Sequence, residues 1–332
     1  MPRISDADLA KQIRRGIGAS AVELGEHVQS LWGGYGELRR AEIRRADATQ
    51  AVSVKHVPPP PERSLSSSPE KLRSHRRKLR SYAVELAFYG GFAGQCPEGC
   101  RVPTLLYGQA EQDRFLFVLE DLDAAGFALR RTQVSEPERA ACIAWLATFH
   151  ARFLNTAPEG LWKVGTYWHL ATRSDELTAL PEGGLRRAAP RIDEQLNRAR
   201  FQTLVHGDAK LENFCFSAGQ AVAAVDFQYV GGGVGVKDLV YFLGSCLHPR
   251  ECEAAVPRYL DLYFAALRGH LTHPGVRQLD STAAGELERE WRELFVWAWV
   301  DFHRFLLGWA PEYAAGDDYS EKLTRELLTR MR

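Results

Sequence analysis

The feature that most constrains this chain is a cluster of polar residues at the ends of short β-like runs in its second half. Asp208 comes directly after the tight pair His206-Gly207, and Asn213 opens the next run five residues later. A hairpin then returns the chain to Asp226. Because a hairpin brings the outer ends of its two strands together, the sequence predicts that Asn213 and Asp226 share one sheet edge with Asp208.

The residue types at this edge are suited to a magnesium site. Mg²⁺ takes hard oxygen ligands and keeps its remaining positions for phosphate oxygens and water. One amide oxygen, from Asn213, and one carboxylate, from Asp226, therefore form a candidate metal site. A second carboxylate, Asp208, remains to face an acceptor hydroxyl as the candidate catalytic base.

The two segments that carry these residues resemble the catalytic and metal loops of protein-kinase-like phosphotransferases. Protein kinases have the patterns H-R-D-x-x-x-x-N and D-F-G at these loops, where this chain has H-G-D-A-K-L-E-N and D-F-Q. Glycine in place of arginine is typical of the small-molecule branch, which includes aminoglycoside phosphotransferases and choline kinases. The D-F-Q triplet, with S-L-W-G-G-Y-G and S-V-K-H-V near the start, is most similar to the ecdysteroid-kinase-like group. The resemblance covers residues 26–241.

The resemblance implies a two-lobed α+β fold, with a small antiparallel sheet and one helix in the N-lobe and a larger, mainly helical C-lobe. It also implies that Lys55, positioned by Glu85, neutralises the α- and β-phosphates of ATP. The resemblance further implies that a turn formed by Gly33, Gly34, Tyr35 and Gly36 binds the nucleotide. It implies that the main chain at Glu120 and Leu122 contacts adenine, and that His206 and Asp238 support the catalytic loop.

Several of these residues also have ordinary structural interpretations, which the sequence leaves open. Lys55 fits a solvated strand lysine, the glycine cluster fits a plain hairpin turn, and Asp238 fits an ordinary N-cap. Asp301 lies among aromatic residues on a predicted helix, where a carboxylate is costly unless it is paired. It either pairs with Arg304 or faces a cationic or hydroxylated acceptor. His150, on an apolar helix, is expected to be a hydrogen-bonded core residue.

Hydrophobic spacing predicts where the elements lie. In the first lobe we expect strands at 26–32, 37–43, 51–57 and 115–119 and a proline- and serine-rich loop at 58–70. The predicted helices cover 71–92, 137–154 and a long segment from near 286. Short strands at 203–205, 213–216 and 221–225 lie between helices, and the glycine run 231–235 is expected to be a mobile loop. We expect lobes at 1–121 and 122–332.

Composition limits the classes of partner. The chain has 42 Lys and Arg against 42 Asp and Glu, and a net charge of zero argues against a nucleic-acid binder. Its longest stretch without charged or histidine residues has 13 residues, whereas a membrane-spanning helix needs about 18. The start has no apolar core of a secretory signal. Cys96 and Cys100 lack a second ligand pair for zinc, so we expect reduced thiols and a cytoplasmic protein.

Together these features predict an ATP-dependent phosphotransferase, with Mg²⁺ as its cofactor, that moves the γ-phosphoryl group to a hydroxyl of a small-molecule acceptor. Two alternatives stay open, a non-catalytic nucleotide-binding module and a protein kinase. Two features argue against a protein kinase: only eleven residues separate Asp226 from Asp238, and no A-P-E triplet follows Asp226 at activation-segment distance. The identity of the acceptor, the preference for ATP or GTP and the oligomeric state are not determined by the sequence.

Overall fold

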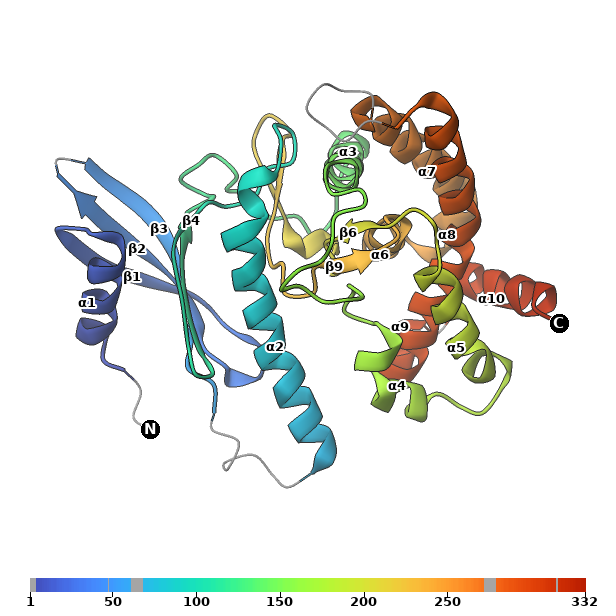
Figure 1. The fold of residues 1–332 in the computed structure, drawn as a ribbon, viewed down its shortest axis with the longest axis horizontal. Coiled ribbons are helices and arrows are strands. Elements are labelled where there is room, and N and C mark those ends of the chain that lie inside the picture. The colour runs from blue at the N-terminus through green and yellow to red at the C-terminus, as the bar shows by residue number, and fades with distance from the viewer. Residues whose placement is uncertain (1–3, 47, 61–67, 272–278, 315) are drawn as a thin grey trace. The chain divides into compact units, whose positions relative to one another are not determined.

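The structure, a computed structural model, describes residues 4–46, 48–60, 68–271, 279–314 and 316–332 (Figure 1). The chain forms two compact units. Unit 1 comprises Met1–Gly94 and Val102–Leu129, and unit 2 comprises Gln95–Arg101 and Arg130–Arg332. Residues 122–129, which the sequence-based division assigns to the second lobe, belong to unit 1. A sheet dominates unit 1 and helices dominate unit 2, so the predicted α+β class is confirmed.

Unit 1 is built on one antiparallel sheet of five strands in the order β1-β2-β3-β5-β4. The strands are β1 (Ala21–Ser30), β2 (Glu37–Arg45), β3 (Ala48–Val57), β4 (Leu105–Glu111) and β5 (Arg114–Glu120). Because successive residues of a strand face opposite sides, alternate side chains such as Ile43, Val54 and Val118 form a core on one face. Helix α1 (Asp6–Ile17) contributes Leu9 and Ile13 to this core.

Unit 1 contains α1 and β4, which the sequence did not predict. Helix α1 is polar apart from a narrow apolar stripe, although its ends carry ordinary signals. Ser5 caps its first turn by accepting a hydrogen bond from the Asp8 amide, and Gly18 ends it in the left-handed conformation. Strand β4 is half-buried along most of its length, so it lacks the alternation of buried and exposed residues that indicates a strand.

Helix α2 (Pro69–Gly91) matches the helix predicted over residues 71–92. It begins two residues earlier, because Pro69 is accepted at the first helical position, where a backbone amide has no partner within the helix. Of the loop predicted before it, residues 61–67 lie outside the described residues. The buried face of α2 carries Tyr82, Glu85 and Phe88, and Glu85 faces β3.

Unit 2 is mainly helical, as predicted. Its described α-helices are α3 (Glu136–Arg152), α4 (Ser174–Ala179), α5 (Gly184–Asn197), α6 (Val236–Cys246), α7 (Pro249–Leu271), α8 (Ser281–Trp309), α9 (Pro311–Ala314) and α10 (Asp318–Arg330). Helix α3 packs against α7, and α8 packs against α5, α6 and α10 (Figure 1). None of the helices in the described ranges is long and apolar enough to cross a membrane.

Four short strands form two small ladders within unit 2. They are β6 (Thr203–Val205), β7 (Phe214–Phe216), β8 (Val222–Ala224) and β9 (Gly231–Gly233). β7 and β8 form the predicted hairpin. The prediction of a mobile glycine loop over 231–235 is wrong, because Gly231–Gly233 form β9, which pairs with β6, and Gly235 is the N-cap of α6. A side chain at Gly231 would clash with the carbonyl oxygen of Trp162, so the glycines permit close packing here.

Candidate active site

Asp208 and Asn213 are held together by hydrogen bonds within the loop that follows β6. The Asn213 side-chain amide donates to the main-chain carbonyl of Asp208 at 2.6 Å and to its carboxylate at 3.1 Å. Because the nitrogen of the Asn213 side chain makes both contacts, its oxygen stays available as a ligand. The short 3₁₀ turn Leu211–Asn213 places this residue directly before β7.

The β7–β8 hairpin brings Asp226 to the same edge as Asn213. The amide of Val225 donates to the carbonyl of Asn213 at 3.0 Å, and Asp226 follows in the left-handed conformation, with φ 65°. Residues other than glycine adopt this conformation mainly at turns and functional positions, and aspartate and asparagine do so most readily. The predicted closeness of these residues is therefore observed.

The ligand types at this edge fit Mg²⁺. An amide oxygen and a carboxylate are hard ligands, and a magnesium ion keeps several positions for phosphate oxygens and water. Among the described residues, no three His, Cys, Asp or Glu side chains gather into a metal-binding group.

The carboxyl group of Asp208 has an unusually high pKa. Burial is the largest cause, the charge of Asp226 is the next, and together they raise the pKa of Asp208 to about 7. Lys210 and the hydrogen bond from Asn213 oppose the rise. A general base works best when its pKa lies near the operating pH, so this environment is suited to proton transfer from an acceptor hydroxyl.

Tyr241 is a candidate site residue that the sequence analysis missed. Its hydroxyl lies close enough to Asp208 for each group to affect the pKa of the other. Its ring lies 5.0 Å from that of Trp168 and 4.9 Å from that of Phe302, between centroids. Tyr241 comes three residues after Asp238 on α6, so both side chains lie on one helix face. That spacing places Tyr241 on the same helix face as Asp238, but it does not by itself indicate a contact with Asp208.

Asp238 holds the backbone of the loop that carries Asp208. Its carboxylate accepts hydrogen bonds from the amides of His206, at 2.5 Å, and Gly207, at 2.9 Å. Helix α6 begins at Val236 after its N-cap Gly235. The N-cap interpretation of Asp238 is therefore wrong, and the carboxylate lies in the first turn of the helix and faces the loop.

His206 and Gly207 shape the same loop. His206 Nε2 donates to the carbonyl of Val225 at 3.0 Å, which links the loop to the end of β8. Burial is the main cause that lowers the pKa of His206. Gly207 has φ 80°, and a side chain there would clash with the carbonyl oxygen of Tyr229. This explains the glycine at the position where protein kinases have arginine.

In unit 1, Lys55 and Glu85 form the expected pair. The Lys55 ammonium group lies 2.6 and 2.9 Å from the two carboxylate oxygens of Glu85, and both side chains are buried. The ammonium group also lies 5.4 Å from the centre of the Tyr82 ring. The interpretation of Lys55 as a solvated strand lysine is therefore wrong.

The turn that holds Gly33, Gly34 and Gly36 is anchored to α2 by its tyrosine. The Tyr35 hydroxyl lies 2.6 Å from Nδ1 of His75, whereas Trp32, at the start of the turn, is 80% exposed. The structure therefore shows a hairpin turn between β1 and β2. Its role in covering phosphates stays a prediction.

The two residues predicted to contact adenine lie at the end of β5 and just after it. The amide of Glu120 donates to the carbonyl of Thr104, and the amide of Phe127 donates to the carbonyl of Leu122. The Leu122 side chain is buried. These bonds fix the backbone of the segment, and contacts of Glu120 and Leu122 with a nucleotide stay a prediction.

Asp301 forms a buried ion pair with Arg304. One carboxylate oxygen accepts hydrogen bonds from Nε and Nη2 of the arginine at 3.0 and 2.8 Å, and both side chains are inaccessible to water. Arg304 also donates to the carbonyl of Trp168. Of the two interpretations of Asp301, the ion pair is thus observed, and the role in an acceptor pocket stays untested.

We expect Asp301→Asn to lower the free energy of unfolding by about 3–5 kcal/mol, because removing one partner leaves the Arg304 charge buried without compensation. Urea denaturation measures the loss. The control is Glu253→Gln, which breaks the exposed pair with Lys322 and is expected to cost less than about 1 kcal/mol. Equal losses in the two variants would contradict a structural role for Asp301.

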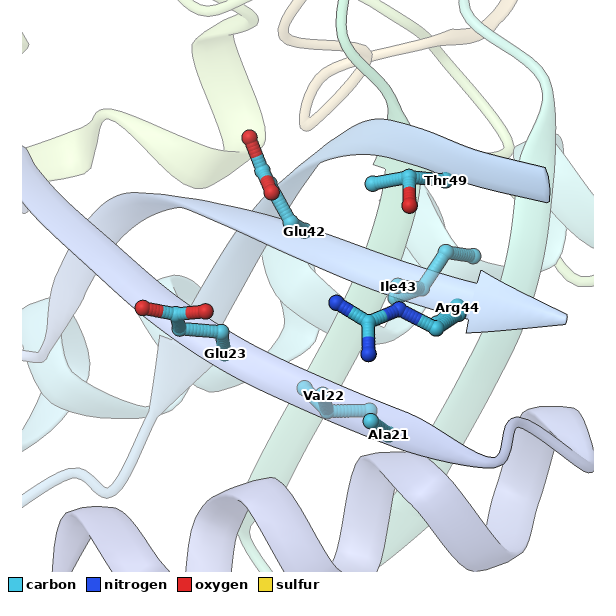
Figure 2. A pocket seen from close by; sticks show the side chains of 7 residues that line it. All are labelled: Ala21, Val22, Glu23, Glu42, Ile43, Arg44 and Thr49. Carbon is cyan, nitrogen blue, oxygen red and sulfur yellow. The ribbon is translucent and has the colours of Figure 1, made fainter. Parts of the chain in front are cut away.

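A hollow of about 280 Å³ lies on the sheet of unit 1. Figure 2 shows the side chains that line it, from β1, β2 and β3: Ala21, Val22, Glu23, Glu42, Ile43, Arg44 and Thr49. Most of them are exposed, and none is a candidate site residue. We therefore assign no role to this hollow.

Residues 171–276 match the sequence model of the ecdysteroid kinase-like family, whereas no curated protein matches the chain. Among solved structures, a microcompartment-associated aminopropanol kinase superposes with a TM-score of 0.50 at 14% identity, covering 98% of this chain and 97% of that chain. A macrolide 2'-phosphotransferase from Brachybacterium faecium gives a TM-score of 0.48 at 15% identity, covering 96% of this chain and 97% of that chain. A thermostable mutant of an aminoglycoside phosphotransferase gives a TM-score of 0.48 at 11% identity, covering 97% of this chain and 98% of that chain.

The aminopropanol kinase therefore shares the fold of this chain. The expected resemblance to kinase-like small-molecule phosphotransferases, and to the ecdysteroid-kinase-like group, is confirmed. The matched range contains the candidate metal and base residues but not Lys55 and Glu85, which lie before residue 171.

Proposed function

We propose that the protein transfers the γ-phosphoryl group of ATP to a hydroxyl group of a small molecule. The observation that carries the proposal is the cluster of Asp208, Asn213 and Asp226, in which one carboxyl group with a pKa of about 7 lies beside two hard oxygen ligands. The fold shared with a small-molecule kinase and the family match over residues 171–276 support the proposal.

Asp208 takes the role of the base. Its carboxylate accepts the proton of the acceptor hydroxyl while that oxygen bonds to the γ-phosphorus atom and the bond from phosphorus to the leaving ADP oxygen breaks. The hydrogen bond from Asn213 orients the carboxylate. The transition state of phosphoryl transfer is loose, so positioning and charge neutralisation supply most of the rate enhancement.

Asn213 and Asp226 take the role of metal ligands. When bound there, magnesium would neutralise negative charge on the phosphate oxygens. Lys55 takes the role of a phosphate ligand for the α- and β-phosphates, and Glu85 holds its ammonium group in place.

A peptide acceptor is disfavoured by the segment between Asp226 and Asp238. Protein kinases bind their substrates at a long activation segment, whereas most of residues 227–235 are buried here and include β9. The remaining alternative is a module that binds a nucleotide without catalysis.

The proposal is tested by measuring ADP release from Mg-ATP by the purified chain with alcohols, amino-alcohols, sterols and aminoglycosides. Mass spectrometry then identifies the phosphorylated acceptor. We expect slow ATP hydrolysis without an acceptor and faster turnover with a suitable one. Binding of Mg-ATP with neither activity would favour the non-catalytic module.

We expect Lys55→Met to lower kcat/KM for ATP by about 10²-fold or more, because a charged donor to the phosphates is lost. The variant is also expected to unfold at lower temperature, since the Glu85 carboxylate stays buried without its partner. The double variant Lys55→Met, Glu85→Gln removes that buried charge. It is expected to regain stability but not activity, and recovery of both would remove Lys55 from the nucleotide site.

A further inference from the structure

A chain of buried hydrogen bonds leads from α7 to the loop that carries Asp208. The Tyr263 hydroxyl on α7 lies 2.8 Å from Nδ1 of His150 on α3. Nε2 of the same imidazole lies 3.0 Å from a carboxylate oxygen of Asp238. That oxygen also accepts the hydrogen bond from the His206 amide. Tyr263, His150 and Asp238 are all inaccessible to water.

The direction of these hydrogen bonds follows from the chemistry of the groups. Asp238 accepts hydrogen bonds from the amides of His206 and Gly207, and the His150 ring that faces it donates from Nε2. In the tautomer that carries its only ring proton on Nε2, Nδ1 is an acceptor, and the Tyr263 hydroxyl donates to it. Burial and the charge of Asp238 raise the pKa of Tyr263 well above its usual value, which keeps this proton on the hydroxyl.

The backbone that precedes Asp238 lies directly against this contact. A side-chain carbon added at Gly235 would lie 2.5 Å from the Tyr263 hydroxyl and 2.7 Å from Nδ1 of His150. The turn that starts α6 therefore packs directly against the Tyr263–His150 pair.

We propose that Tyr263 is a positioning residue for the catalytic loop. Asp238 sets the His150 tautomer that carries its proton on Nε2, and Tyr263, by donating to Nδ1, holds the orientation of that ring. The held ring fixes the Asp238 carboxylate, which in turn holds the amides of His206 and Gly207 and so the direction of Asp208. The effect on turnover rests on the proposed function, whereas the effect on the ring and the loop does not.

Tyr259 supplies a matched control on the same helix. It lies one turn before Tyr263 and is equally buried. Its hydroxyl accepts from Arg139 at 2.6 Å and donates to Glu136 at 2.9 Å, away from the catalytic loop. Tyr259→Phe and Tyr263→Phe therefore both remove one phenol hydroxyl from α7, but only the second removes a donor to His150.

The first readout is turnover with an identified acceptor. We expect Tyr263→Phe to lower kcat about tenfold, because small misplacement of a catalytic group costs up to about 10²-fold. The KM for ATP is expected to stay within about twofold, since no ground-state contact to the nucleotide is lost. Tyr259→Phe is expected to leave kcat unchanged, and equal kcat losses in both variants would overturn the proposal.

The second readout needs no activity. In protein labelled with ¹⁵N-histidine, NMR is expected to show His150 of the wild type protonated at Nε2, with an Nδ1 resonance shifted by the hydrogen bond from Tyr263. Tyr263→Phe is expected to move that Nδ1 resonance to the position of a ring nitrogen that accepts no hydrogen bond. Hydrogen exchange of the His206 and Gly207 amides is expected to become faster in Tyr263→Phe but not in Tyr259→Phe. An unchanged Nδ1 resonance and unchanged exchange would overturn the positioning role even if the wild type were inactive as a transferase.

A second variant keeps the test decisive if Tyr263→Phe changes overall stability. His150→Gln retains a side-chain N–H for Asp238 but has no ring nitrogen for the tyrosine. If Tyr263 acts through His150, adding Tyr263→Phe to His150→Gln is expected to change kcat less than it does in the wild type, because mutations in one hydrogen-bond chain are not additive. Additive losses would overturn the route through His150.

Discussion

Asp208→Asn is expected to lower kcat by about 10²–10⁴-fold, the range that general-base assistance supplies. Asparagine keeps the shape of the side chain and loses only the proton acceptor. The fold is expected to survive, because Asn213 can still donate to the main-chain carbonyl of residue 208. The dissociation constant for Mg-ATP is expected to change little, since a group that acts in the transition state contributes little to ground-state binding.

The measurement combines kcat with an identified acceptor and calorimetric binding of Mg-ATP on one purified variant. The control is Glu212→Gln, which removes an exposed carboxylate from the same loop and is expected to leave both quantities near the wild type. A large loss of Mg-ATP affinity with kcat preserved at saturation would instead place Asp208 among the metal ligands.

The candidate site could be predicted from the sequence because its chemistry depends on short-range spacing. Asp208 and Asn213 are five residues apart, and a short hairpin fixes the return of the chain to Asp226. Local geometry of this kind leaves few alternatives. Tyr241 was not found, because its contact with Asp208 arises from the way α6 packs against the loop, and its own neighbours in sequence are apolar.

The elements that were missed depend on tertiary packing. The glycines of β9 carry no hydrophobic signal, and their strand exists because β6 and the backbone near Trp162 approach them closely. Asp301 had two open interpretations, since spacing alone does not show which way a helical side chain points. The ion pair with Arg304 became evident only from their positions in the packed unit.

Asp226→Asn is expected to lower metal-dependent turnover by about 10²-fold or more, because a charged ligand that helps to hold the metal is lost, and bound metal ions supply several kcal/mol of transition-state stabilisation. Calorimetry is expected to show much weaker binding of Mg-ATP than in the wild type. Binding of ATP without Mg²⁺ is expected to stay the same or to become slightly tighter, since one negative charge near the phosphates is removed.

The backbone at this position makes asparagine the informative replacement. Asp226 has φ 65°, a conformation that asparagine tolerates and that most other residues adopt only with strain. A loss of function in Asp226→Asn therefore reports on the charge, whereas Asp226→Ala would add backbone strain to the loss of the ligand. If the carboxylate serves the metal, raising the Mg²⁺ concentration is expected to restore part of the turnover of Asp226→Asn. An affinity for Mg-ATP equal to that of the wild type would remove Asp226 from the metal site.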